Sequence, residues 1–287
     1  MSNDAPKPIL LVDGRNLMYR AIFANKNGKG YSKAHHFVVM LRFMWGWLDK
    51  FQPCAVNVFW DAPRKSVWRR KVFPGYKNRD GKKYRDDIKD DLIITQAAAR
   101  AIFAHMGVRQ YKKKGMEADD LIYSACRVLS PSPIIICSSD KDYEQIVFRM
   151  TNVRHYDPMK EKFTGAPDYD PALAKALAGD TSDTIDGYEG IGPVKSGKLA
   201  RSVTDLEEFL EARGKEPYIR NRLLVDMALC PYLLKNDLYV RKVLASHTSF
   251  DKKVIMAEGK KHRVGGLASE FSRIVGPFKL LLENDQK

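Results

Sequence analysis

The sequence predicts an α/β fold with a mostly parallel β-sheet, followed by a helical region. Three short apolar runs, each followed closely by an aspartate, are expected as strands: 8–12, 54–60 and 134–137. Runs of this length, bounded by polar residues or glycine, are typical of buried parallel strands. Stretches with helical periodicity lie between them at 36–51, 87–106 and 117–129. Alternation of strands and helices is the pattern of a parallel sheet covered by helices.

A basic segment interrupts this alternation between residues 62 and 91. Its thirty residues contain eleven Lys or Arg and five Asp, and also Trp68, Tyr76 and Tyr84. We expect an insert that faces solvent. There its basic side chains can follow phosphates and its aromatic rings can stack on unpaired bases. Tyr76, beside Lys77, is the aromatic residue that we expect to contact a ligand. Trp68 is expected in the core.

From about residue 170 the pattern is helical. Helices are expected at 170–179, from Pro193, near 204–213 and at 217–229, with a glycine-punctuated turn at 187–192. The basic stretch 250–266 has no pattern that we can assign. We therefore divide the chain into an α/β domain, residues 1–168, and a helical region, residues 169–287.

Composition excludes several classes of protein. Hydrophobic residues make up 44% of the chain and charged residues 29%, which is ordinary for a globular protein. The four cysteines are widely spaced and form no CxxC pair, so neither a disulfide framework nor a zinc site is expected. No apolar run approaches the ~20 residues of a membrane span, and no secretory signal is recognisable, so we expect a cytoplasmic protein without a membrane partner. The net charge of +14 favours a polyanionic partner, most simply nucleic acid.

Nine acidic side chains gather at predicted strand ends and helix starts. They are Asp13, Asp61, Glu117, Asp119, Asp120, Asp140, Asp142, Asp180 and Asp183. In sheets of this kind, ligands bind at the carboxyl ends of the strands. Carboxylates that converge repel one another and are stabilised by a cation, and their oxygens select hard ions such as Mg²⁺ or Mn²⁺. Two ions ~4 Å apart would hold the attacking and leaving oxygens of a phosphodiester displacement, without a side-chain general base.

Each acidic motif also has a simpler explanation when it is taken alone. Asp13 and its following glycine could form a turn at a strand end. Glu117 and Asp119 could complement a helix dipole, and Asp180 and Asp183 could cap a helix. The prediction of a metal site therefore depends on all of these groups falling on one edge of one sheet.

Five segments resemble, in order and spacing, the sequence blocks of the 5′-nuclease family. They are VDGRNLMYR (12–20), VFWDAPRKSVWRRKVFPGYKNR (58–79), GMEADDLIY (115–123), ICSSDKDYEQIV (136–147) and LAGDTSDTIDGYEGIGPVKSGKLA (177–200). That family holds phage 5′-3′ exonucleases, bacterial flap endonucleases, the N-terminal domain of bacterial DNA polymerase I and eukaryotic flap endonuclease. The chain's size, and its lack of a polymerase domain, resemble a free-standing phage 5′-3′ exonuclease.

The resemblance implies a PIN-like α/β fold and assigns the nine carboxylates to two metal ions. The ion nearer the chemistry would be held by Asp13, Asp61, Glu117, Asp119, Asp120 and Asp140. A second site would be completed by Asp142, Asp180 and Asp183. Arg20 and Lys77 match the basic residues that meet the scissile phosphate in the family. Thr184 and Asp186 stand where the family usually has Asn and Pro.

The resemblance also implies two elements that hold DNA. Residues 62–91 would form a helical arch through which the 5′ end of a single strand passes, with Tyr76, Lys77 and Arg79 beside it. Residues 185–201 would form a helix-hairpin-helix that grips the duplex backbone and, in the family, often binds K⁺. Its predicted DNA contacts are Gly190, Gly192, Lys195, Lys198 and Arg201.

The residues around the glycine turn support this interpretation independently. The order Glu189-Gly-Ile-Gly-Pro193 is typical of a tight turn that leads into a helix with proline at its first position. Lys195, Lys198 and Arg201 then follow at spacings that place them on one side of that helix. A plain connector between two helices is the simpler alternative.

We therefore expect an Mg²⁺-dependent, structure-specific 5′-3′ exonuclease and 5′-flap endonuclease that uses two ions, for which Mn²⁺ can substitute. Its substrate would be DNA with a 5′ single-stranded end or flap, met in DNA replication or in primer or flap removal. The chain would act as a monomer, with a replicative polymerase in trans. Two rivals are an RNA-cutting PIN-type nuclease and a junction-binding protein without catalysis. The insert and the glycine turn argue against the first rival, and nine carboxylates facing phosphate argue against the second.

Overall fold

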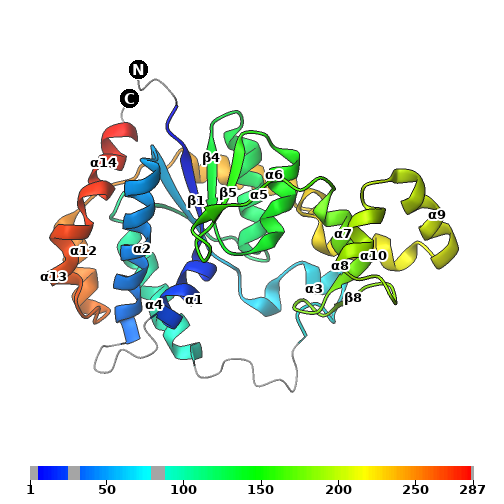
Figure 1. Cartoon of the computed structure of the whole chain (residues 1–287). Helices are drawn as coiled ribbons and strands as arrows, with labels where there is room; N and C mark the ends of the chain where they lie inside the picture. Colours follow the sequence, from blue (N-terminus) through cyan, green and yellow to red (C-terminus); the bar gives the residue numbers. More distant parts are fainter. Residues whose placement is uncertain (1–5, 25–32, 79–87, 286–287) are drawn as a thin grey trace.

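A six-stranded sheet forms the centre of the computed structural model, which describes residues 6–24, 33–78 and 88–285 (Figure 1). The strand order is β3-β2-β1-β4-β5-β6. Five strands are parallel: β1 (Ile9–Asp13), β2 (Ala55–Phe59), β3 (Arg109–Tyr111), β4 (Ile134–Cys137) and β5 (Val153–Asp157). Among the described strands of this sheet, only β6 (Lys162–Phe163) is antiparallel to its neighbour. The predicted mostly parallel α/β fold is therefore confirmed.

Strand β1 lies in the middle of the sheet, between β2 and β4. Asp13 is paired with Phe59 in β2, and Val12 is paired with Cys137 in β4, so the three strands end at the same edge. All three were predicted from their apolar runs. Strands β3 and β5 were not predicted, because polar residues interrupt their sequences, RQY and VRHYD.

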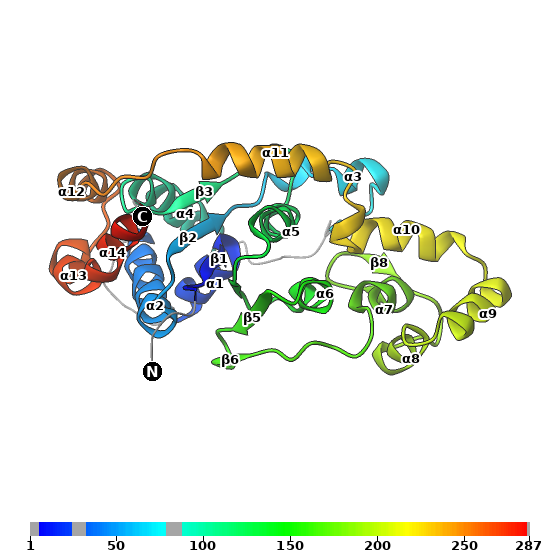
Figure 2. The same cartoon turned by 90° about the horizontal axis from the view of Figure 1, so that it is seen from above.

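Helices cover both faces of the sheet, because successive side chains of a strand point to opposite faces. Leu10 and Val12 join a core with α1 (Gly14–Ala24), α2 (His36–Phe51) and α4 (Lys89–Phe103). Leu11 points the other way, into a core with α5 (Ala118–Leu129), α6 (Glu144–Arg149) and α11 (Leu233–Leu244) (Figure 2). None of the described helices is long and apolar enough to cross a lipid bilayer.

The helices after residue 169 fall into two groups that pack against different parts of the molecule. Helices α7 (Pro171–Ala178), α8 (Pro193–Leu199), α9 (Val203–Arg213) and α10 (Glu216–Val225) extend to one side of the sheet (Figure 1). Beyond them, α11 packs along α5. The last three helices, α12 (Lys252–Lys261), α13 (Leu267–Ile274) and α14 (Gly276–Asp285), bury apolar residues in the core of α2 and α4. Helices α11 to α14 therefore pack against elements of the α/β part, although the sequence analysis placed them in the helical region, residues 169–287.

The first part of the basic insert is folded against the protein. It contains a 3₁₀ turn, Arg64–Ser66, and the short helix α3, Arg69–Val72. Val67, Trp68 and Tyr76 are each buried. The expected core position of Trp68 is confirmed, whereas the expected solvent-facing insert is found only in part, since Arg64, Lys65 and Lys71 are exposed while Val67 and Tyr76 are buried. Residues 79–87 of the predicted arch, which include Arg79, lie outside the described part of the chain, and residues 89–91 form the first turn of α4.

Candidate metal centre

Two adjoining cavities lie at the edge of the sheet where β1, β2 and β4 end, with volumes of about 370 and 410 Å³. The first is lined by Asp13, Asp61 and Glu117, and the second by Asp142 and Asp180. Both are lined by Asp119, Asp140 and Asp183. Eight of the nine predicted carboxylates therefore converge on connected space, although the chain supplies them from five separate segments.

Asp13 is placed where strand β1 turns directly into helix α1. Its carboxylate accepts hydrogen bonds from the Asn16 backbone N–H at 3.0 Å and from the Tyr143 hydroxyl at 3.1 Å. The following residue, Gly14, leaves no room for a side chain, since a Cβ there would lie 2.5 Å from the Trp60 ring. The glycine thus permits the close approach that turns Asp13 toward the cavity.

Asp61 and the EADD segment meet at the start of helix α5. Asp61 accepts a hydrogen bond of 2.8 Å from the backbone N–H of Ala118, near the amino end of that helix. Glu117 caps the helix and forms a reciprocal capping box with Asp120. Asp120 is fully buried and binds Arg69 at 2.9 Å, and it lines neither cavity. Asp120, which the resemblance assigns to the metal ions, is thus held beneath the cavities by capping and by its pairing with Arg69.

Asp180 and Asp183 are carried by a tight hairpin between β7 (Gly179–Asp180) and β8 (Ile185–Asp186). The hairpin closes through two glycines. A Cβ at Gly179 would lie 2.4 Å from the backbone nitrogen of Gly187, and a Cβ at Gly187 would lie 2.2 Å from the backbone of Ala178. Only glycine fits at either position, so the spacing of the two aspartates depends on this backbone contact.

Thr184 follows Asp183 in a left-handed conformation, with φ of 61°. Asparagine adopts this conformation more readily than a β-branched residue does. The Thr184 hydroxyl donates a hydrogen bond of 3.1 Å to the carbonyl of Asn78, next to Lys77. Thr184, which replaces the family's usual asparagine, therefore joins the hairpin to the basic insert through this hydrogen bond.

The carboxylates influence one another's ionisation. Burial, followed by the nearby charge of Asp61, raises the pKa of Asp13 to about 7. Burial also raises the pKa values of Asp61, Asp142 and Asp183, although each has a basic neighbour. Carboxyl groups with raised pKa values in a shared cavity gain most from a bound cation, which would stabilise their ionised forms.

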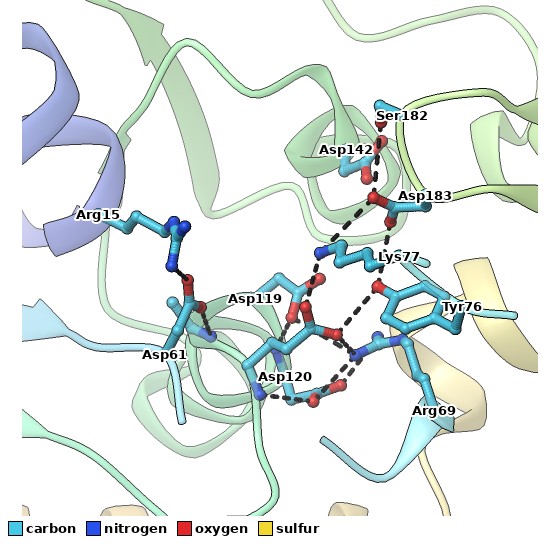
Figure 3. A network of polar contacts seen from close by, with 12 residues as sticks. Arg15, Asp61, Arg69, Tyr76, Lys77, Asp119, Asp120, Asp142, Ser182 and Asp183 are labelled. Atoms are coloured by element: carbon cyan, nitrogen blue, oxygen red, sulfur yellow. Dashed lines mark hydrogen bonds and ion pairs between the residues drawn. The ribbon is translucent and has the colours of Figure 1, made fainter. Parts of the chain in front are cut away.

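Two lysine ammonium groups lie among these carboxylates. Lys77 Nζ is 2.6 Å from a Glu117 carboxylate oxygen and 3.6 Å from Asp183 (Figure 3). Lys175 Nζ is 2.6 Å from both Asp142 and Asp180. Across the described residues, no three acidic, His or Cys side chains converge closely enough to form a metal cage. The oxygen donors are nonetheless of the type that hard divalent cations select, and the two lysines mark where positive charge is stabilised.

A buried guanidinium, Arg69, connects the insert to the metal centre from below (Figure 3). Arg69 is 1% exposed and donates to Glu117 at 2.8 Å, to Asp120 and to the backbone carbonyl of Leu224 in α10. Tyr76 packs beside it, 2% exposed, and its hydroxyl donates to Glu117 at 2.9 Å. The ring of Tyr76 is therefore enclosed and its hydroxyl is engaged with the carboxylates, whereas stacking on DNA bases would require an exposed ring.

Arg20 does not reach the carboxylates. Its guanidinium packs over the Phe43 ring, 4.4 Å from the centroid, and points to the sulfur of Met159. Arg15, one turn earlier on α1, instead lines the first cavity and lies 3.7 Å from Asp61. The prediction that Arg20 meets the reacting phosphate is therefore not supported by its position, whereas Lys77 lines both cavities.

The glycine turn leads into helix α8 at Pro193, as the sequence predicts. A Cβ at Gly190 or Gly192 would meet nothing, so packing within the protein does not require either glycine to lack a side chain. Lys195 and Lys198 are exposed on α8. Arg201 lies beyond the end of the helix and pairs with Asp168 at 2.8 Å, so its predicted place in a row with the two lysines is wrong.

Two residues that the sequence analysis did not single out matter most to this site. Lys175 is separated by 33 positions from Asp142, and no spacing rule connects the two. Arg69 stood among eleven basic residues of the insert, where only the apolar Val67-Trp68 pair before it indicated burial. Both roles became visible only when the contacts between distant segments were known.

Comparisons with known proteins agree with this geometry. Residues 8–172 match the sequence profile of the 5′-3′ exonuclease N-terminal resolvase-like domain. A 5′-3′ exonuclease of Mycoplasma pneumoniae is 26% identical over 93% of this chain and 100% of its own length. The flap endonuclease Xni of Pectobacterium carotovorum is 30% identical over 72% of this chain and 78% of its own. A bacteriophage T5 protein co-crystallised with metal ions shares the fold, with a TM-score of 0.64 and 18% identity over 89% of this chain and 98% of that one.

Proposed function

We propose, from the premise that this chain is a nuclease of the 5′-3′ exonuclease family, that it hydrolyses DNA phosphodiester bonds at free single-stranded 5′ ends and at 5′ flaps, using two Mg²⁺ ions. Mn²⁺ would substitute for Mg²⁺. A flap endonuclease of bacteriophage T5 with the same fold was crystallised with DNA and metal ions. We further propose a role in replication, in primer or flap removal beside a polymerase supplied by another chain.

One observation carries this proposal, namely the convergence of eight carboxylates on two connected cavities. A protein that only bound DNA would be weakened by such a cluster, since phosphate and carboxylate repel each other. Asp13, Asp61, Asp119 and Asp140 would hold one ion, and Asp140, Asp142, Asp180 and Asp183 the other. When bound, such ions supply Lewis acidity and lower the pKa of a water molecule.

Lys77 is the side chain of this chain best placed to act on the reacting phosphate. It lines both cavities, and its backbone N–H donates to the carbonyl of Asp183 at 2.7 Å. Its φ of 50° is unusual for a residue other than glycine, and such strain concentrates at functional positions. An ammonium group held there would stabilise the negative charge that develops on phosphate oxygens during displacement.

Binding of the duplex is assigned to the glycine turn and to α8. Both glycines face open space, and Lys195 and Lys198 are exposed on the same helix. Backbone amides and lysines of this kind contact phosphates without reading the base sequence. The insert would admit the single-stranded 5′ end.

A 5′-flap oligonucleotide tests the proposal directly. With Mg²⁺ the enzyme should cut the flap near its junction with the duplex, whereas EDTA should abolish cutting, because the carboxylates then lack their cations. A 3′ flap on the same duplex should survive, since it offers no end of the required polarity. The products are sized on a denaturing gel.

A bulky protein attached to the 5′ terminus of the flap tests whether the single strand must pass through the insert or only binds at its surface. A block attached before the enzyme is added should suppress cutting, because a bulky end cannot pass the insert. If the block is attached after enzyme and DNA have formed a complex, that complex should still cut the flap. Efficient cutting of the 3′ flap, or cutting that ignores an earlier block, would contradict the proposal.

Substitutions should also distinguish a residue that acts on the reacting phosphate from a residue that binds the duplex. Lys77→Ala should slow single-turnover cleavage of bound substrate, by about a hundredfold or more, because the lost charge acts on the reacting phosphate. Lys198→Ala should instead weaken binding and reduce the slope of log affinity against log salt by about one phosphate contact. If Lys198→Ala left affinity and slope unchanged but slowed cleavage, the assignment of α8 to duplex binding would be wrong.

A further inference from the structure

The second cavity contains a lysine that binds the very carboxylates expected to hold a metal ion. Lys175 extends from α7, and its ammonium lies 2.6 Å from each oxygen of Asp142. It also lies 2.6 Å from one oxygen of Asp180. An ammonium group has three N–H donors, so these three contacts use all of its hydrogen-bonding capacity.

This contact differs from an ordinary surface ion pair. The side chains of Lys175, Asp142 and Asp180 are only 22%, 28% and 12% exposed, so water screens their charges weakly. Lys175 and a divalent cation would need the same oxygens, and two positive charges at that distance would repel each other. The lysine and the ion therefore exclude one another from this position.

We propose that the ammonium of Lys175 is a built-in cation that competes with the second divalent ion for Asp142 and Asp180. The competition makes this ion bind more weakly than the one held at the ends of β1, β2 and β4. It also keeps the two carboxylates neutralised when only one ion is present. The inference rests on the proposed function, because it assumes that divalent cations bind at this centre.

The fold offers the displaced lysine a second position. Lys175 also lines a third cavity of about 210 Å³ between α6, α7 and α8. Glu144 lines that cavity and carries a carboxylate that can accept the ammonium. Movement of the Lys175 ammonium from Asp180 into this cavity would open the second metal site.

Direct counting of bound Mn²⁺ tests this competition without any measurement of cleavage. Electron paramagnetic resonance of free Mn²⁺, in the absence of DNA, gives the number and the affinity of bound ions. Wild-type protein should show one tighter and one weaker ion. In Lys175→Met, the weaker ion should tighten by about tenfold or more, as expected when a charge in direct contact is removed. Lys175→Gln is a second variant that removes the charge.

Lys141 provides a matched control, because it lines the same second and third cavities and is exposed. Lys141→Met removes an equal charge from the neighbourhood, and we expect less than about a threefold change, because an exposed charge is screened. Lys175→Arg retains the charge and should retain the weak ion. In EDTA, Lys175→Met should have a lower melting temperature than wild type. Addition of Mn²⁺ should raise the melting temperature of Lys175→Met by more than it raises that of wild type.

The possible results separate the two hypotheses. Unchanged affinity of the weaker ion in both Lys175→Met and Lys175→Gln would overturn the competition while leaving the nuclease proposal intact. An equal effect of Lys141→Met would also overturn it, since general charge would then explain the change. If wild-type protein bound no Mn²⁺ at all, the proposed function itself would fail, and the competition with it.

Discussion

Asp140→Ala should reduce cleavage of a 5′-flap substrate by at least about a thousandfold, with little loss of folding or DNA affinity. Asp140 lines both cavities and is exposed, so its carboxylate is placed to hold ions and its removal leaves no buried gap. A bound ion contributes several kcal/mol to the transition state, and each 1.36 kcal/mol is a factor of about ten in rate. Asp119→Ala should have a similar effect, because Asp119 also lines both cavities.

Single-turnover cleavage, DNA binding in EDTA and thermal melting together check this expectation. DNA affinity should stay equal or rise, since a negative charge beside the phosphate path has been removed. Asp49→Asn is a suitable control, because Asp49 is an exposed carboxylate on α2 and lines neither cavity. Wild-type turnover in both alanine variants would refute the assignment of these carboxylates to the metal centre.

Arg69→Ala should lower the free energy of unfolding by about 3–5 kcal/mol, the typical cost of removing one partner of a buried ion pair. Arg69 neutralises Asp120, which is fully buried, and Glu117, which is 6% exposed. Without the guanidinium, Asp120 would stay desolvated without this ion pair, and Glu117 would keep only its contact with Lys77 as an ion pair among the described residues. The hydrogen bond from Arg69 to Leu224, which joins the insert to α10, would also be lost.

Urea denaturation of Arg69→Ala and of Lys71→Ala isolates the effect of burial. Lys71 is a basic residue on the same short helix, α3, but it is exposed, so its substitution should change stability by about 0.5 kcal/mol or less. Arg69→Lys should recover only part of the loss, because an ammonium cannot reproduce the forked contacts of a guanidinium. Similar midpoints for Arg69→Ala and Lys71→Ala would show that the buried network is not stabilising.

Patterns within single segments were predicted well. Helix α2 spans His36–Phe51, the range that periodicity predicts, β2 and β4 lie within their apolar runs, and β1 extends one residue beyond its run to Asp13. The convergence of the strand-end aspartates followed from the geometry of parallel strands. In contrast, β5 was missed, because its sequence VRHYD contains no continuous apolar run, although only Arg154 of its five residues is exposed.

The sequence by itself determined the fold class and the acidic edge of the sheet, because strand periodicity and the positions of aspartates after strands are local properties of the chain. Only the tertiary structure decided which charged groups face the cavity. Asp119 and Asp120 are adjacent in sequence, yet Asp119 lines the cavity while Asp120 lies beneath it in the capping box of helix α5. Arg69, Tyr76 and Lys175 acquired their roles from partners 33 to 155 positions away. The ionisation and orientation of such groups depend on burial and neighbouring charge, and these arise only when distant segments pack together.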